Sequence, residues 1–110
     1  MNNWSSSKDL AADNRYGEKS VPLLAARASR AFHEMTPIRF QPAEPSRVYR
    51  KVSYGPLLDL FFLDLRSYRG PNGANLQTTL SGDDRIIGEA QMRWLKRALS
   101  ESRATWKVIA

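Results

Sequence analysis

The stretch from Leu57 to Arg69 constrains the fold of this chain more than any other segment. Its first part, residues 57–65, is mostly apolar, which predicts a strand buried on both faces, as in the central sheets of α/β proteins. The apolar run then ends in charge, at Asp64, Arg66 and Arg69. Open α/β sheets bind their ligands beyond the carboxyl ends of their strands, so these three side chains are candidates for the edge of a functional site.

The two arginines suit a phosphate ligand, because a planar guanidinium donates two hydrogen bonds at once. A structural alternative stays open, in which Asp64 pairs with an arginine and braces the loop after the strand.

The rest of the chain predicts an incomplete α/β sheet with two helices. Apolar residues recur at helical spacing after Ser20, a candidate helix N-cap, and Pro37 ends this helix. The predicted elements, in chain order, are a polar loop at 1–20, a helix at 21–35, strands at 47–54 and 57–65 joined by a tight turn, a long loop at 67–87, a helix at 88–101 and a strand that begins at 105. The chain stops inside the last strand, so we expect exposed sheet edges and poor folding of the isolated chain.

The 110 residues contain 17 basic and 11 acidic side chains, which gives a net charge of +6. A basic chain can bind nucleic acid, so a small module for nucleic acid or another polyanion is the alternative function. The basic residues are spread along the chain, which favours an ordinary solvated surface instead. The chain has no cysteine, no apolar run long enough to cross a membrane and no signal-peptide pattern, so we expect no membrane association and leave its localisation open.

Motifs for catalysis or metal binding are sparse. His33 is the one histidine, so we expect a residue on the surface or at the edge of a helix rather than a metal ligand. Asp83 and Asp84 suit either a cation site or a turn before the next helix, and the turn is favoured. Gln91 and Trp94 fall in the last predicted helix, where Trp94 is expected to pack against the sheet.

Ordered blocks of the sequence resemble the PhoD-like alkaline phosphatases, a metallophosphatase family. Residues 62–69 are similar to that family's F-x-D-x-R-x-x-R block, and residues 86–95 resemble its L-G-x-x-Q-x-x-W-L element. Residues 102–109 resemble its S-x-A-T-W-K-V-I strand entry, and residues 31–39 resemble its A-F-x-E-x-x-P-x-R helix end. The segment Asn2–Trp4 looks like the residues that follow the family's W-D-D-H-E motif.

The resemblance implies that residues 21–110 are part of a four-layer α/β metallophosphoesterase fold. It also implies hydrolysis of phosphomonoesters and phosphodiesters at a site with iron and calcium, in relatives that are typically exported. The family's metal-ligand motifs are not matched in this chain. We therefore expect an internal fragment that binds no metal alone and is inactive without the remainder of the catalytic domain.

Under this interpretation, Arg66 and Arg69 are candidates for substrate binding, and Asp64, Asn2 and Asn3 are candidates for shaping the site. No residue of the chain is expected to be a catalytic group or a metal ligand. The expected partners are phosphate esters and the remainder of the domain, and neither nucleic acid nor a membrane is expected.

Overall fold

The computed structural model describes residues 1, 3–71, 73–74, 76–79 and 81–110. In chain order its elements are helix α1 (Val21–Met35), strands β1 (Arg50–Tyr54) and β2 (Leu58–Phe62), the short 3-10 helix η1 (Gly82–Asp84), helix α2 (Glu89–Glu101) and strand β3 (Trp106–Ile109). This order confirms the predicted α/β class. No helix in the described part of the chain is long and apolar enough to cross a membrane.

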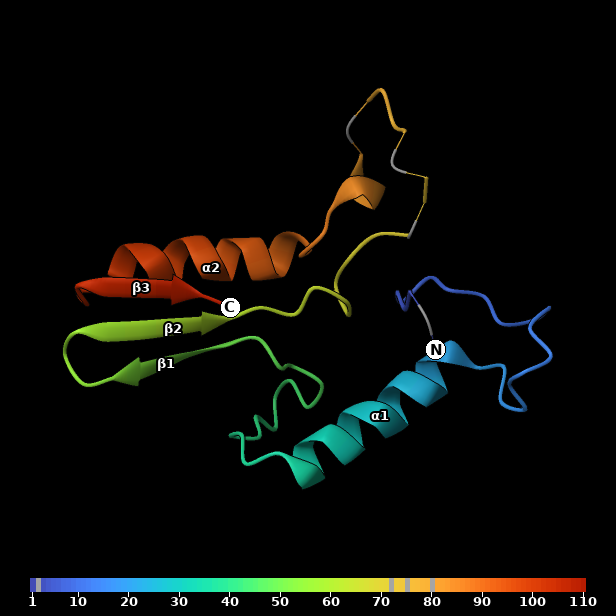
Figure 1. The fold of residues 1–110 in the computed structure, drawn as a ribbon, viewed down its shortest axis with the longest axis horizontal. Coiled ribbons are helices and arrows are strands. Elements are labelled where there is room, and N and C mark those ends of the chain that lie inside the picture. The colour runs from blue at the N-terminus through green and yellow to red at the C-terminus, as the bar shows by residue number, and fades with distance from the viewer. Residues whose placement is uncertain (2, 72, 75, 80) are drawn as a thin grey trace.

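The three strands form one mixed sheet in the order β1-β2-β3 (Figure 1). β1 and β2 are antiparallel, with Arg50 opposite Phe62 and Tyr54 opposite Leu58, which confirms the predicted pair. The turn between them contains Gly55, whose φ of 62° is a left-handed conformation that glycine adopts without a steric cost. β3 runs parallel to β2, and α2 lies between them in the chain, because parallel strands need a crossover connection. β2 is therefore the central strand.

Helix α2 covers one face of the sheet and forms the core with it (Figure 1). Phe61 of β2 is fully buried and packs against Leu95 and Ala98 of α2. Trp94 is partly buried against the same cluster, which confirms the expected packing of this side chain. The periodic apolar face of α2 thus fixes the helix over the end of the central strand.

The opposite face of the sheet is only half covered. Its central side chains Leu58, Leu60 and Phe62 are half-buried, and its flanking side chains are exposed, namely Val52, Tyr54, Trp106 and Val108. The expectation that strand 57–65 is buried on both faces is therefore wrong for this chain. The reason is that α2 covers one face, whereas side chains on the other face remain open to solvent.

Helix α1 lies apart from the sheet (Figure 1). It begins as predicted, because the Ser20 hydroxyl accepts a hydrogen bond from the Leu23 N–H at 3.3 Å. Val21 of its apolar stripe is buried, whereas Phe32 and Met35 are exposed. The radius of gyration is 16.4 Å, against about 13 Å for a compact domain of this length. Helix α1 and the sheet therefore do not share one core.

Candidate functional site

The loop that follows β2, residues 63–70, is folded around the carboxylate of Asp64 and is called the strand-exit loop below. Asp64 Oδ1 accepts hydrogen bonds from the backbone N–H groups of Arg66 and Ser67, at 2.9 and 2.8 Å. Aspartate favours such local turns because its short side chain reaches the backbone just ahead of it. Asp64 is only 6% exposed, and its Oδ2 has no hydrogen-bond partner among the described residues. One carboxylate oxygen therefore braces the loop, and one is left over.

Gln91 of α2 holds the backbone of the same residue. Its Oε1 accepts from the Asp64 N–H at 2.7 Å, and its Nε2 donates to the Asp64 carbonyl at 2.9 Å. Nε2 also donates to the Ile87 carbonyl at 2.9 Å. Gln91 is fully buried, so these bonds form where an unsatisfied amide would be costly. The sequence alone gives Gln91 no partner, although the glutamine of the L-G-x-x-Q-x-x-W-L element was a signal that could have singled it out.

Two glycines let the strand-exit loop approach the segment before α2. The Gly70 N–H donates to the Arg85 carbonyl at 2.9 Å, and a Cβ on Gly70 would overlap the backbone opposite it. Gly88 has φ 69° and ψ 162°, a conformation open essentially only to glycine. A Cβ on Gly88 would lie 2.7 Å from the Tyr68 carbonyl oxygen. The two main blocks of the family resemblance therefore pack directly against each other.

An aromatic cluster anchors Tyr68 of the strand-exit loop. The Tyr68 ring meets the Tyr49 ring edge-on, with the ring centroids 5.3 Å apart. The centroids of the Tyr49 ring and the Trp94 ring of α2 are 4.9 Å apart. The Arg47 guanidinium lies 4.2 Å from the Tyr49 ring centre, which is a favourable cation–π geometry. Burial raises the pKa of the Tyr68 hydroxyl above its ordinary value, so this group stays neutral at physiological pH. Ring packing thus adds to the hydrogen bonds that fix the loop.

The residues predicted to form the site lie at different depths. Asp64 is buried, Arg69 is half-buried and Arg66 is exposed on the strand-exit loop. Asn3 is exposed and has a φ of 47°, which asparagine tolerates better than most residues. Asn2 lies outside the described residues. The roles expected for these five residues stay predictions.

A cavity of about 820 Å³ lies beside the strand-exit loop and is lined by segments that are distant in sequence. Its walls include Met1 and Trp4 from the N-terminal segment, Val48 before β1, and Asp64 and Ser67 from the loop. Most of the remaining lining residues belong to α1. The N-terminal segment and the strand-exit loop therefore line one cavity, but Asn3 is not among its lining residues.

The other candidate residues, His33 and Asp84, form hydrogen bonds within their own helix or turn. His33 Nδ1 is 2.8 Å from the Ser29 carbonyl oxygen, one helical turn away, and the residue is half-buried on α1. Asp84 accepts from the Ser81 N–H and closes the capping box of η1, as expected for a turn. The part of the chain that the structure describes contains no group of three or more His, Cys, Asp or Glu side chains that could hold a metal ion. The side chains that the structure describes therefore do not fit the ligand set of a resident metal ion.

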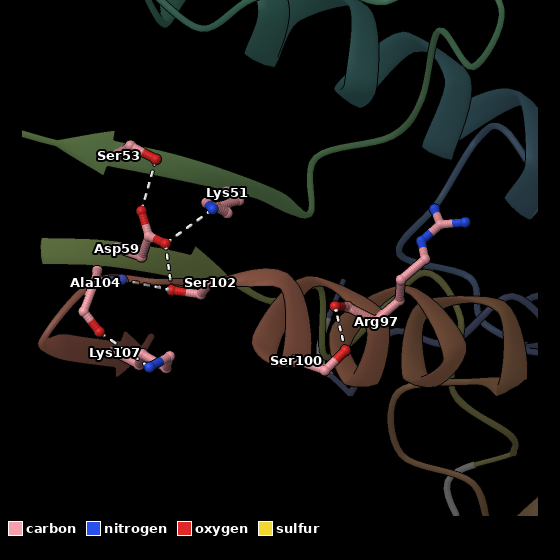
Figure 2. A network of polar contacts seen from close by, with 8 residues as sticks. All are labelled: Lys51, Ser53, Asp59, Arg97, Ser100, Ser102, Ala104 and Lys107. Atoms are coloured by element: carbon pink, nitrogen blue, oxygen red, sulfur yellow. Dashed lines mark hydrogen bonds and ion pairs between the residues drawn. The ribbon is translucent and has the colours of Figure 1, made fainter. Parts of the chain in front are cut away.

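A second polar network is centred on Asp59, the second residue of β2 (Figure 2). Lys51 Nζ lies 2.8 Å from its Oδ2, Ser53 donates to its Oδ1 at 2.6 Å, and the Ser102 hydroxyl donates to its Oδ2. The hydrogen bond from Lys51, followed by those from the two serines, lowers the pKa of Asp59 to about 2. Asp59 is 4% exposed and both its oxygens are occupied, so the network ties β1, β2 and the end of α2 together.

The mixed sheet, its covering helix and the arginine-bearing loop form an α/β unit, and comparison with known proteins shows which family this unit belongs to. Residues 1–110 match the sequence model of the family described as "PhoD-like phosphatase". The chain therefore belongs to the PhoD-like phosphatase family. The predicted family is confirmed.

Two relatives show how much of the family fold the chain represents. Alkaline phosphatase D of Bacillus subtilis (strain 168) is 32% identical over an alignment 120 residues long, which covers 93% of this chain and 21% of that protein. A solved structure described as "Structure of PhoD" matches with a TM-score of 0.69 at 28% identity, covering 99% of this chain and 22% of the other. The chain thus spans about a fifth of the length of these relatives.

Proposed function

We propose that this chain forms part of the catalytic domain of an enzyme that hydrolyses phosphate esters with bound metals, and that the strand-exit loop lies at the rim of the active site. The observation that supports this most is a braced, arginine-bearing loop in a member of the PhoD-like phosphatase family. A guanidinium donates two hydrogen bonds in one plane and so matches two oxygens of a phosphoryl group. In this proposal Arg66 and Arg69 bind the phosphate, and Asp64, Asn2 and Asn3 shape the site.

Iron and calcium are the metals that the family resemblance implies, and the proposal assigns their ligands to the remainder of the catalytic domain. Among the described residues, Asp64 Oδ2 is a buried carboxylate oxygen without a hydrogen-bond partner, but one oxygen cannot hold an ion that needs several ligands. The chain by itself is therefore proposed to bind no metal and to be inactive. Its partner in catalysis is the rest of the domain, and its substrates are phosphate esters.

A chimera tests this proposal. The matched segment of the Bacillus subtilis alkaline phosphatase D is replaced by residues 1–110, and hydrolysis of p-nitrophenyl phosphate and bis-p-nitrophenyl phosphate is measured with iron and calcium present. We expect the chimera to hydrolyse phosphate esters. Arg66→Ala and Arg69→Ala are each expected to raise KM and to weaken inhibition by inorganic phosphate about tenfold or more, since a hydrogen bond to a charged group contributes about 1.5–3 kcal/mol.

Arg97→Ala is the matched control, because Arg97 is an exposed arginine of α2 outside the strand-exit loop (Figure 2). This variant is expected to keep the KM of the unsubstituted chimera. A folded chimera without activity would count against the proposal. So would Arg66→Ala and Arg69→Ala variants that keep the original KM and the original inhibition by phosphate.

A further inference from the structure

Gln91 continues the backbone hydrogen bonding of the sheet at the point where the strands end. β2 ends at Phe62, and the next N–H, that of Leu63, still donates to the Ala110 carbonyl at 2.8 Å. One residue further, the N–H and C=O of Asp64 both bind the side-chain amide of Gln91, at 2.7 and 2.9 Å. A neighbouring strand would offer the same donor and acceptor, so Gln91 takes the place of a strand partner.

We propose that Gln91 is a positioning residue of the phosphatase site, which holds the strand-exit loop so that Arg66 and Arg69 stay at the phosphate. This inference rests on the proposed function. The two turn hydrogen bonds to Asp64 Oδ1 fix the local shape of the loop, because all their atoms belong to the loop itself. The Gln91 amide instead joins the loop to α2, and so fixes where the arginines lie relative to the core.

The role requires a primary amide of this length. A glutamate would accept from the Asp64 N–H, but its charge would face the carbonyl oxygens of Asp64 and Ile87, to which Nε2 now donates. A methionine has nearly the same volume and forms none of the three hydrogen bonds, so it leaves the buried N–H and C=O of Asp64 unsatisfied. Gln91→Met therefore removes the tether with little change in packing volume.

The test uses Gln91→Met in the chimera, with Gln41→Met at an exposed position as the matched control. We expect Gln91→Met to raise KM and the inhibition constant of inorganic phosphate on the order of tenfold, because displacement of a binding group by a fraction of an ångström weakens its contacts. A partly folded variant has fewer active molecules but the same KM and inhibition constant, so these two quantities separate positioning from stability. Hydrogen exchange measured by mass spectrometry is expected to become faster at residues 64–70.

Each outcome decides between the proposals. The positioning role of Gln91 would be overturned if Gln91→Met left KM and the phosphate inhibition constant unchanged, or left hydrogen exchange at residues 64–70 unchanged. The proposed function would still stand in that case, provided that Arg66→Ala weakens phosphate binding. An unsubstituted chimera that folds but is inactive would overturn the proposed function and this inference with it. Gln41→Met is expected to match the unsubstituted chimera in all three measurements.

Discussion

Substitution of Gly88 by alanine perturbs the contact between α2 and the strand-exit loop in two ways. Gly88 has φ 69° and ψ 162°, and another residue in that region carries about 1–3 kcal/mol of backbone strain. The new Cβ would also lie 2.7 Å from the carbonyl oxygen of Tyr68 and 2.9 Å from the Cβ of Tyr68, so Tyr68 has to move. Overpacking of this kind adds about 1–3 kcal/mol. We therefore expect Gly88→Ala to lower the free energy of unfolding by about 2–6 kcal/mol.

Two other glycines separate these contributions. Gly55 has a φ of 62° but no atom within 4 Å of the place where a Cβ would lie, so Gly55→Ala is expected to lower the free energy of unfolding through left-handed strain alone, by about 1–2 kcal/mol. Gly17 has neither a left-handed φ nor a close neighbour, so Gly17→Ala is expected to change the free energy of unfolding by no more than about 0.5 kcal/mol. Urea unfolding of the three variants in the chimera measures the order. A Gly88→Ala variant no less stable than Gly55→Ala would refute the close packing of Gly88 on Tyr68.

The remaining predictions concern the Asp59 network and the exposed apolar surface. The pKa of Asp59 falls from its ordinary 3.8 to about 2, so its contribution to stability is present above about pH 4 and is lost as the pH falls through 2. The stability difference between Asp59→Asn and the unsubstituted chimera is therefore expected to shrink between pH 4 and pH 2 in urea titrations, and a constant difference would contradict the network. Because Trp106 and Tyr54 are 67% and 77% exposed on the open sheet face, the isolated chain is expected to melt gradually, and a sharp transition in circular dichroism would contradict this.

Elements that depend on local sequence were predictable. The predicted helix 21–35 has the bounds of α1, because Ser20 supplies the N-cap and Pro37 prevents continuation. The predicted strand 57–65 is longer than the observed Leu58–Phe62, because its apolar residues continue after the regular ladder ends. Hydrophobic pattern marks where a strand lies, but hydrogen bonding decides where it stops.

Features that depend on distant contacts were not predictable. Gln91 binds the backbone of Asp64 from 27 positions away, and Ser102 binds Asp59 from 43 positions away, so neither pair has a local signal. The family blocks located Asp64 and Gln91 separately, without indicating that they touch. Likewise, an apolar strand shows a preference for burial on both faces, but it does not show how many layers this chain itself provides.

Hydrolysis of p-nitrophenyl phosphate by the isolated residues 1–110, assayed beside the chimera with iron and calcium present, tests most directly whether the chain supplies one part of a phosphatase site. We predict no hydrolysis above the buffer rate by the isolated chain and clear hydrolysis by the chimera. Hydrolysis by the isolated chain would contradict the claim that residues 1–110 need the remainder of the catalytic domain. A folded chimera that releases no p-nitrophenol would contradict the claim that the strand-exit loop belongs to the active site.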